Sequence, residues 1–212
     1  MTKESRPAGR LLLWERTDAW GAEVASVELT PHGVRATGTQ LGIDPVAYRL
    51  DYELDAGDGW VTRRLGVRTS GEGWTRSLEL TRGDDGRWRR ETGETGEVEL
   101  PSPGGPVHGL GDAVDCDLGL SPLTNLMPIR RHRLHERPGK VDLVAAWVSA
   151  PDLALHRYPQ RYEHVRMDER SATVRFEDRG LFPGFESELQ LDADGLVREY
   201  PQLARRVEPS RH

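Results

Sequence analysis

The chain contains 212 residues, of which 30% are charged and 36% hydrophobic, and its formal net charge at pH 7 is −6. This negative charge argues against a protein that binds nucleic acid. A single cysteine, Cys116, excludes a disulfide framework and a zinc site built mainly on cysteine. The length fits one domain over residues 1–212 with a sizeable core.

The apolar segments are short. Near the start of the chain the uninterrupted apolar run covers only residues 11–14, whereas the core of a signal peptide needs about 7–15 apolar residues and a membrane-spanning helix about 20. We therefore expect no transmembrane segment and a cytoplasmic location.

Alternation of apolar and polar residues with a period of two dominates the chain and predicts half-buried strands. In residues 48–55, tyrosines and leucines alternate with charged residues, and three later segments follow the same pattern: 141–147, 172–176 and 185–191. Turn sequences rich in glycine, proline and aspartate separate such runs, at residues 31–33, 57–59, 83–86 and 193–195. Because the connections are short, neighbouring strands should be antiparallel.

The spacing of the turns indicates about ten or more strands. No segment predicts a helix longer than about two turns. Residues 153–162 have room for a turn of helix that Pro159 limits, and residues 92–111 predict a long loop. We therefore predict a mostly β protein with little helix, in which a highly curved antiparallel sheet forms a roll or open barrel. Its concave face must be filled by side chains or by a ligand.

The least ordinary segment is residues 115–131, which read DCDLGLSPLTNLMPIRR. With residues 160–162 and 194–201, it resembles the bacterial family named "Putative glycolipid-binding", whose central signature is D-x-D…P-x-T-N-x-x-P-I-R-R. The matching positions are Asp115, Asp117, Pro122, Thr124, Asn125, Pro128, Ile129, Arg130 and Arg131, and early positions that continue the match are Trp20, Gly21, Glu23 and Trp60. Met127 stands where many relatives have leucine, which conserves volume.

The resemblance covers nearly the whole chain. It implies a single-domain antiparallel β roll with a large concave or enclosed surface, and a glycolipid as the partner. It implies no reaction, no cofactor and no catalytic residue.

The role of the two aspartates of the motif has three possible interpretations. In a strand, Asp115 and Asp117 point to the same face about 7 Å apart. Such a pair suits acid and base catalysis on a glycoside, or a hard cation. The interpretation that we favour is a structural clamp, in which Asp115 and Asp117 pair with Arg130 and Arg131. The arginines should then keep both aspartates ionised.

Other residues of the motif are candidates for ligand binding. Read as a strand, residues 130–137 would let Arg130 or Arg131 grip an anionic headgroup, and the Asn125 amide would meet a sugar hydroxyl. Aromatic side chains receive sugars and acyl chains, and the candidates here are Trp60, Trp147 and Tyr162. No metal-binding motif occurs. Cys116 should be a small buried residue.

These observations favour a binding protein over an enzyme. We expect non-catalytic binding of an amphipathic ligand, a glycolipid or a lipid-like molecule, on the concave face of the sheet. The first alternative is a hydrolase that uses Asp115 and Asp117. The second is a protein-interaction module that uses an exposed strand edge.

Overall fold

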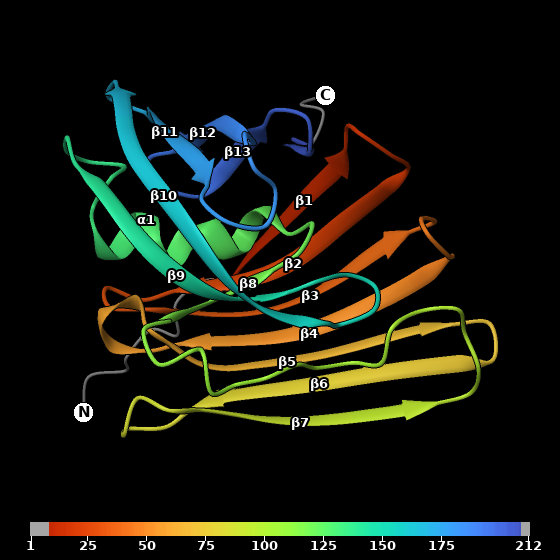
Figure 1. Cartoon of the computed structure of the whole chain (residues 1–212). Helices are drawn as coiled ribbons and strands as arrows, with labels where there is room; N and C mark the ends of the chain where they lie inside the picture. The colour runs from red at the N-terminus through yellow and green to blue at the C-terminus, as the bar shows by residue number, and fades with distance from the viewer. Residues whose placement is uncertain (1–8, 209–212) are drawn as a thin grey trace, which may run out of the picture.

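The computed structural model describes residues 9–208, and these form a single sheet of 14 strands with three short helical segments (Figure 1). The sheet is strongly curved and does not close into a barrel. The prediction of a mostly β protein, in which a highly curved antiparallel sheet forms a roll or open barrel, is thus confirmed.

The first half of the chain is a meander of seven antiparallel strands in the order β7-β6-β5-β4-β3-β2-β1. Its strands are β1 (Arg10–Arg16), β2 (Gly21–Leu29), β3 (Val34–Gly42), β4 (Tyr48–Ala56), β5 (Thr62–Gly71), β6 (Trp74–Arg82) and β7 (Trp88–Thr95). A short 3-10 helix, η1 (Asp58–Trp60), lies between β4 and β5.

The second half continues the sheet from β1 in the order β14-β13-β12-β11-β10-β9-β8. Its strands are β8 (Asp115–Leu118), β9 (Lys140–Val148), β10 (Leu155–Met167), β11 (Ser171–Asp178), β12 (Glu186–Asp192), β13 (Val197–Tyr200) and β14 (Ala204–Arg206). All neighbours are antiparallel except β8 and β9, which are parallel. The 3-10 helix η2 (Pro122–Asn125) and the helix α1 (Leu126–Arg131) follow β8.

Alternation along each strand decides which face of the first half is buried. On β4, Leu50, Tyr52 and Leu54 are buried, whereas Asp51 and Glu53, which alternate with them, are partly or fully exposed. We call the first face the inner face and the second the outer face. The inner face packs against apolar side chains of β8, η2, α1 and β9 in one hydrophobic cluster.

A second hydrophobic cluster fills the curve of the second half. Tyr162, Phe176 and Leu189 on its strands pack together with Ile129 and Leu134, which lie on α1 and just beyond it. The concave side of the sheet is therefore occupied by the protein's own side chains.

Two expected turns are confirmed with the conformation that glycine allows. Gly86, between β6 and β7, has φ of 74°, and Gly195, between β12 and β13, has φ of 81°. Both angles lie in the left-handed region, which residues with a Cβ adopt at a cost. The long loop expected over residues 92–111 is observed over residues 96–114, because residues 92–95 belong to β7.

The structure corrects two expectations about local structure. Residues 130–137 are not a strand, because Arg130 and Arg131 end helix α1 and a series of turns follows. Pro128 is compatible with the helix because it lies in the first turn, where backbone N–H groups lack helical partners. Among residues 9–208, no helix has the length and apolar character needed to cross a membrane.

The second correction concerns residues 153–162, where the strand β10 begins at Leu155 and no turn of helix forms. Pro159 is tolerated within this strand. Its carbonyl accepts a hydrogen bond from the Arg179 N–H, while regular pairing with β11 starts only at Gln160. The N–H that proline lacks would therefore have pointed to a position outside the β11 ladder.

Candidate ligand-binding groove

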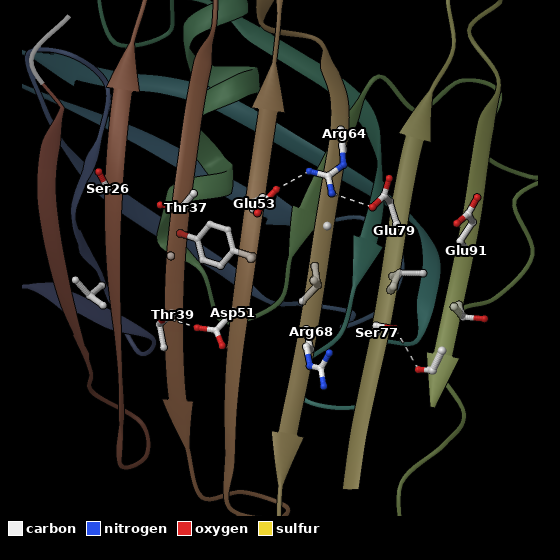
Figure 2. A pocket seen from close by; sticks show the side chains of 18 of the residues that line it. Ser26, Thr37, Thr39, Asp51, Glu53, Arg64, Arg68, Ser77, Glu79 and Glu91 are labelled. Atoms are coloured by element: carbon white, nitrogen blue, oxygen red, sulfur yellow. Dashed lines mark hydrogen bonds and ion pairs between the residues drawn. The ribbon is translucent and has the colours of Figure 1, made fainter. Parts of the chain in front are cut away.

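A groove of about 750 Å³ lies on the outer face of the first half, across β1 to β7. Figure 2 shows its polar side chains standing on neighbouring strands, with Thr37 and Thr39 on one side and Glu79 and Glu91 on the other. The complete lining is Leu11, Val24, Ser26, Thr37, Gly38, Thr39, Asp51, Tyr52, Glu53, Arg64, Gly66, Val67, Arg68, Ser77, Leu78, Glu79, Glu91, Thr92 and Gly93.

The hollow follows from the register of the strands. Glu53 lies directly opposite Gly66, and Gly66 lies opposite Glu79. In the adjacent row, Ser77 lies opposite Gly93. Because neither glycine places a side chain on the outer face, the longer side chains around them stand over open space.

Ion pairs hold some of the lining in place. The Arg64 guanidinium donates to Glu53 Oε2 at 2.7 Å and to Glu79 Oε2 at 2.8 Å. The hydrogen bond from Arg64 lowers the pKa of Glu79. Burial would raise the pKa of Asp51, but hydrogen bonds from Arg49 and Thr39 outweigh it and the net pKa is lowered. The carboxyl groups of Glu79 and Asp51 are therefore ionised at neutral pH.

Other groups in the groove are free to meet a ligand. Within the described part of the chain, Arg68 and Glu91 form neither an ion pair nor a side-chain hydrogen bond, and Figure 2 draws both without a contact. Carboxylates accept hydrogen bonds, a guanidinium donates them, and hydroxyls such as that of Thr37 do both. This mixture suits a ligand rich in hydroxyl groups.

Apolar side chains continue the same outer face beyond the groove. Leu13 lies opposite Val24, and the Val207 N–H donates to the Leu13 carbonyl at 2.8 Å, so the three form one row across β2, β1 and the end of β14. Leu11 and Leu13 are 74% and 41% exposed, and Val207 is 41% exposed. We call Leu11, Leu13, Val24 and Val207 the apolar strip. Val24 in turn lies opposite Thr39 of the groove.

The residues proposed from the sequence gather elsewhere, around α1, and none of them lines this groove. Arg131 forms a two-pronged ion pair with Asp115, with Nη1 2.6 Å from Oδ1, and also donates to the Trp60 carbonyl at 3.2 Å. Arg130 stacks over the Trp60 ring, 4.7 Å from its centroid, and donates to the Asp194 carbonyl at 3.2 Å. Both arginines therefore contact the protein itself.

The remaining candidates also contact the protein. Tyr162 donates to Asn125 Oδ1 at 2.9 Å, and both residues are buried. Trp147 belongs to an aromatic group with Tyr158 and Phe182, whose ring centroids lie 5.9 and 5.6 Å from its own. Trp147 is only partly buried.

Only two of the four expected clamp residues pair with each other. Asp117 accepts from Thr124 Oγ1 at 2.7 Å and from Gln160 Nε2 at 2.6 Å, and makes no ion pair with Arg130 or Arg131. Burial raises the pKa of Asp117 to about 6, although these hydrogen bonds oppose it. Burial also raises the pKa of Asp115, and Arg131 only partly offsets this effect.

The expectation that neighbouring arginines lower both aspartate pKa values is therefore wrong, because burial has the larger effect. Nothing in this geometry supports hydrolysis by the two aspartates. Cys116 is buried, and burial raises its pKa to about 12.

The sequence analysis named Glu23 only as a position that matches the family and missed that it is a buried acid on the inner face of β2. Glu23 on β2 is 3% exposed and accepts hydrogen bonds at Oε1 from Tyr52 at 2.5 Å and Ser121 at 2.8 Å. Burial raises its pKa to about 7, although these bonds oppose the rise. Its second oxygen, Oε2, has no hydrogen-bond partner, and neither has Oε1 of Gln40, directly opposite on β3. A signal was available, because Glu23 shares a strand face with Ala25 and Val27.

Comparison with known proteins identifies the family. Residues 11–206 match the family model described as "Putative glycolipid-binding". The chain belongs to this family. Its fold is similar to that in a 1.80 Å crystal structure of a DUF1089 family protein from Pseudomonas aeruginosa, with a TM-score of 0.64 and 25% sequence identity over 87% of this chain and 92% of that one. Comparison with curated proteins gives no match.

The Asp115–Arg131 pair yields the first prediction. Arg131→Ala should lower the free energy of unfolding by about 3–5 kcal/mol, because it leaves the Asp115 carboxylate buried without its counter-charge. Arg89→Ala is the control, because it removes an exposed arginine that pairs with Asp85, and it should cost at most about 1 kcal/mol. Urea unfolding at pH 7 measures both. Equal effects for the two variants would contradict a stabilising role for the buried pair.

Glu23 yields the second prediction. Its pKa is about 7 in the folded protein against an ordinary value of 4.5. Folding therefore favours the protonated acid, so its stabilising contribution is complete below pH 4.5 and is lost as pH rises to about 7. Relative to Glu23→Gln, the wild type should lose about 3 kcal/mol of unfolding free energy between these values.

Urea unfolding of both proteins at a series of pH values tests this. The raised pKa values of Asp115 and Asp117 act in the same direction in both proteins, so the comparison isolates Glu23. Glutamine keeps an acceptor for Tyr52 and Ser121 and brings an N–H donor toward Gln40. Parallel stability curves for the two proteins would show that Glu23 does not titrate in this range.

Proposed function

We propose that the protein binds a glycolipid, or a similar amphiphile with a sugar headgroup, on the outer face of its sheet. The headgroup would occupy the groove, and the acyl chain would lie along the apolar strip. No reaction is part of this proposal. The family to which the chain belongs supports a glycolipid-like partner.

The observation that carries the proposal is the change of character along one row of the outer face. From Val207 through Leu13 to Val24 the side chains are apolar, and from Thr39 through Asp51 to Arg68 they are polar or charged. Neighbouring strands lie about 4.8 Å apart, so the change from apolar to polar side chains between Val24 and Thr39 takes place within one strand spacing. A ligand with one polar and one apolar end matches this boundary.

The two parts of the surface would contribute different kinds of free energy. Removal of apolar area from water on the strip stabilises the complex by about 25 cal/mol per Å². In the groove, hydrogen bonds to ionised groups fix the orientation of the sugar, and their net gain is small because they replace bonds to water. The strip would therefore supply affinity, and the groove would supply selectivity.

This proposal moves the ligand from the expected concave face to the outer face. The concave face is filled by the two hydrophobic clusters, which contain the buried Trp60 and Tyr162. The residues around α1 then hold the fold together, and the groove residues contact the ligand.

The test is calorimetric titration with n-octyl glucoside below its micelle concentration. We expect it to bind more tightly than either free glucose, which lacks the chain, or n-octyl phosphocholine, which lacks the sugar. Arg68→Ala should weaken octyl glucoside binding about three- to tenfold without destabilising the fold, because Arg68 holds no ion pair within residues 9–208. Equal affinity for the two octyl compounds would reject the sugar site.

A variant that fills the groove provides a second test of the proposal. Gly66→Leu places a side chain in the hollow, where a Cβ would meet only the end of the flexible Arg64 side chain, 3.0 Å away. It should abolish octyl glucoside binding. Gly111→Leu is the matched control, since a Cβ at Gly111 meets no atom within 4 Å and this residue lies outside the groove. If Gly66→Leu and Gly111→Leu bind alike, the ligand does not use the groove.

A further inference from the structure

Exposed large apolar side chains are concentrated in one region of the sheet. In residues 9–208, six of the eight such side chains lie on the outer face of β1 to β3 and at the end of β14 or in the turns beside them. They are Leu11, Leu13, Trp20, Leu41, Ile43 and Val207, and the two elsewhere are Met167 and Phe182. The apolar strip accounts for three of the six.

The other three form what we call the apolar tip: Trp20, Leu41 and Ile43, with exposed fractions of 64%, 43% and 54%. Gly21 lies opposite Gly42 at the end of the β2–β3 ladder, so Trp20 directly precedes the first paired residue of β2 and Ile43 directly follows the last paired residue of β3. Figure 1 shows that the β1–β2 and β3–β4 turns project from the same end of the sheet.

The apolar tip is continuous with the apolar strip. Leu41 lies opposite Ala22, and Ala22 is followed on the same face of β2 by Val24, which belongs to the strip. A path of apolar side chains therefore runs from the projecting turns to the boundary of the groove.

The charged side chains around the apolar tip favour contact with a surface that carries no net charge. Arg16 donates to Asp18 Oδ1 at 2.6 Å, and Arg49 donates to Asp51 Oδ2 at 2.8 Å, so each arginine beside the tip already has a carboxylate partner. Asp44, in the β3–β4 turn, adds a negative charge without an ion pair in the described chain. An anionic surface would therefore not be attracted to this end. Tryptophan, which the apolar tip exposes at Trp20, is one of the two residues enriched at the boundary between water and hydrocarbon.

We propose that the apolar tip inserts into the interfacial layer of a zwitterionic or uncharged lipid bilayer. Contact at this end places the strip and the groove next to the membrane surface, so that an acyl chain can leave the bilayer along apolar side chains without crossing water. The inference rests on the proposed function for its purpose, but the membrane contact is measured separately.

The experiment is co-sedimentation with phosphatidylcholine vesicles. We expect the wild type to sediment with them, and the double variant Trp20→Ser/Ile43→Ser to bind at least tenfold more weakly. The matched control is Met167→Ser/Phe182→Ser, which removes the two exposed apolar residues that lie outside this region and should bind as the wild type does. Adding phosphatidylserine to the vesicles should not strengthen binding.

The outcomes separate this inference from the proposed function. Loss of vesicle binding in Trp20→Ser/Ile43→Ser with unchanged octyl glucoside affinity supports the tip as the membrane contact. Vesicle binding without octyl glucoside binding supports the tip and rejects the sugar site. Failure of the wild type to sediment, or equal loss in both double variants, overturns the inference. The inference is also overturned if light scattering shows that the wild type is a dimer which does not bind vesicles, and that Trp20→Ser/Ile43→Ser dissociates this dimer.

Discussion

The ion pair between Asp115 and Arg131 anchors helix α1 on the concave side of the sheet. It attaches the end of α1 to β8, and Arg131 also reaches the Trp60 carbonyl after β4, so one side chain connects both halves of the chain. Since α1 then sits inside the curve, apolar side chains from both halves can close around it. The concave side is therefore filled by packed side chains.

Because packed side chains fill the concave face of the sheet, only the outer face is accessible to a ligand. The same alternation that buries Leu50 and Leu54 places Asp51 and Glu53 outside, so core and groove are two results of one pattern. What makes the outer face more than an ordinary polar surface is the pair of glycines, Gly66 and Gly93, that leave space among long side chains. On the inner face, the buried Glu23 accepts a hydrogen bond from Tyr52, which lines the groove, and its raised pKa should make the fold sensitive to pH.

The sequence was informative about strands and less so about the site. Period-two alternation predicted strands such as residues 48–55 because each is half-buried, and the signature motif brought Asp115 and Arg131 into the argument. Alternation cannot say which face of a curved sheet is filled, and the groove depends on Gly66 of β5 and Gly93 of β7, which strand register places in neighbouring rows. Helix α1 was missed because a segment of six residues carries too little periodicity, and the raised pKa values of Asp115 and Asp117 depend on burial that sequence does not show.

The seam between β1 and β14, in the middle of the sheet, joins the first strand of the chain to the last through three residue pairs, from Trp14↔Arg206 to Arg16↔Ala204. All strands that form the groove are synthesised by residue 95, whereas Val207 joins Leu13 only after the second half has emerged from the ribosome. During synthesis the polar part of the surface is therefore complete long before the apolar part. The inner apolar face of the meander also stays uncovered until β8, η2, α1 and β9 have emerged, and an exposed apolar face of this kind makes a folding intermediate prone to aggregate.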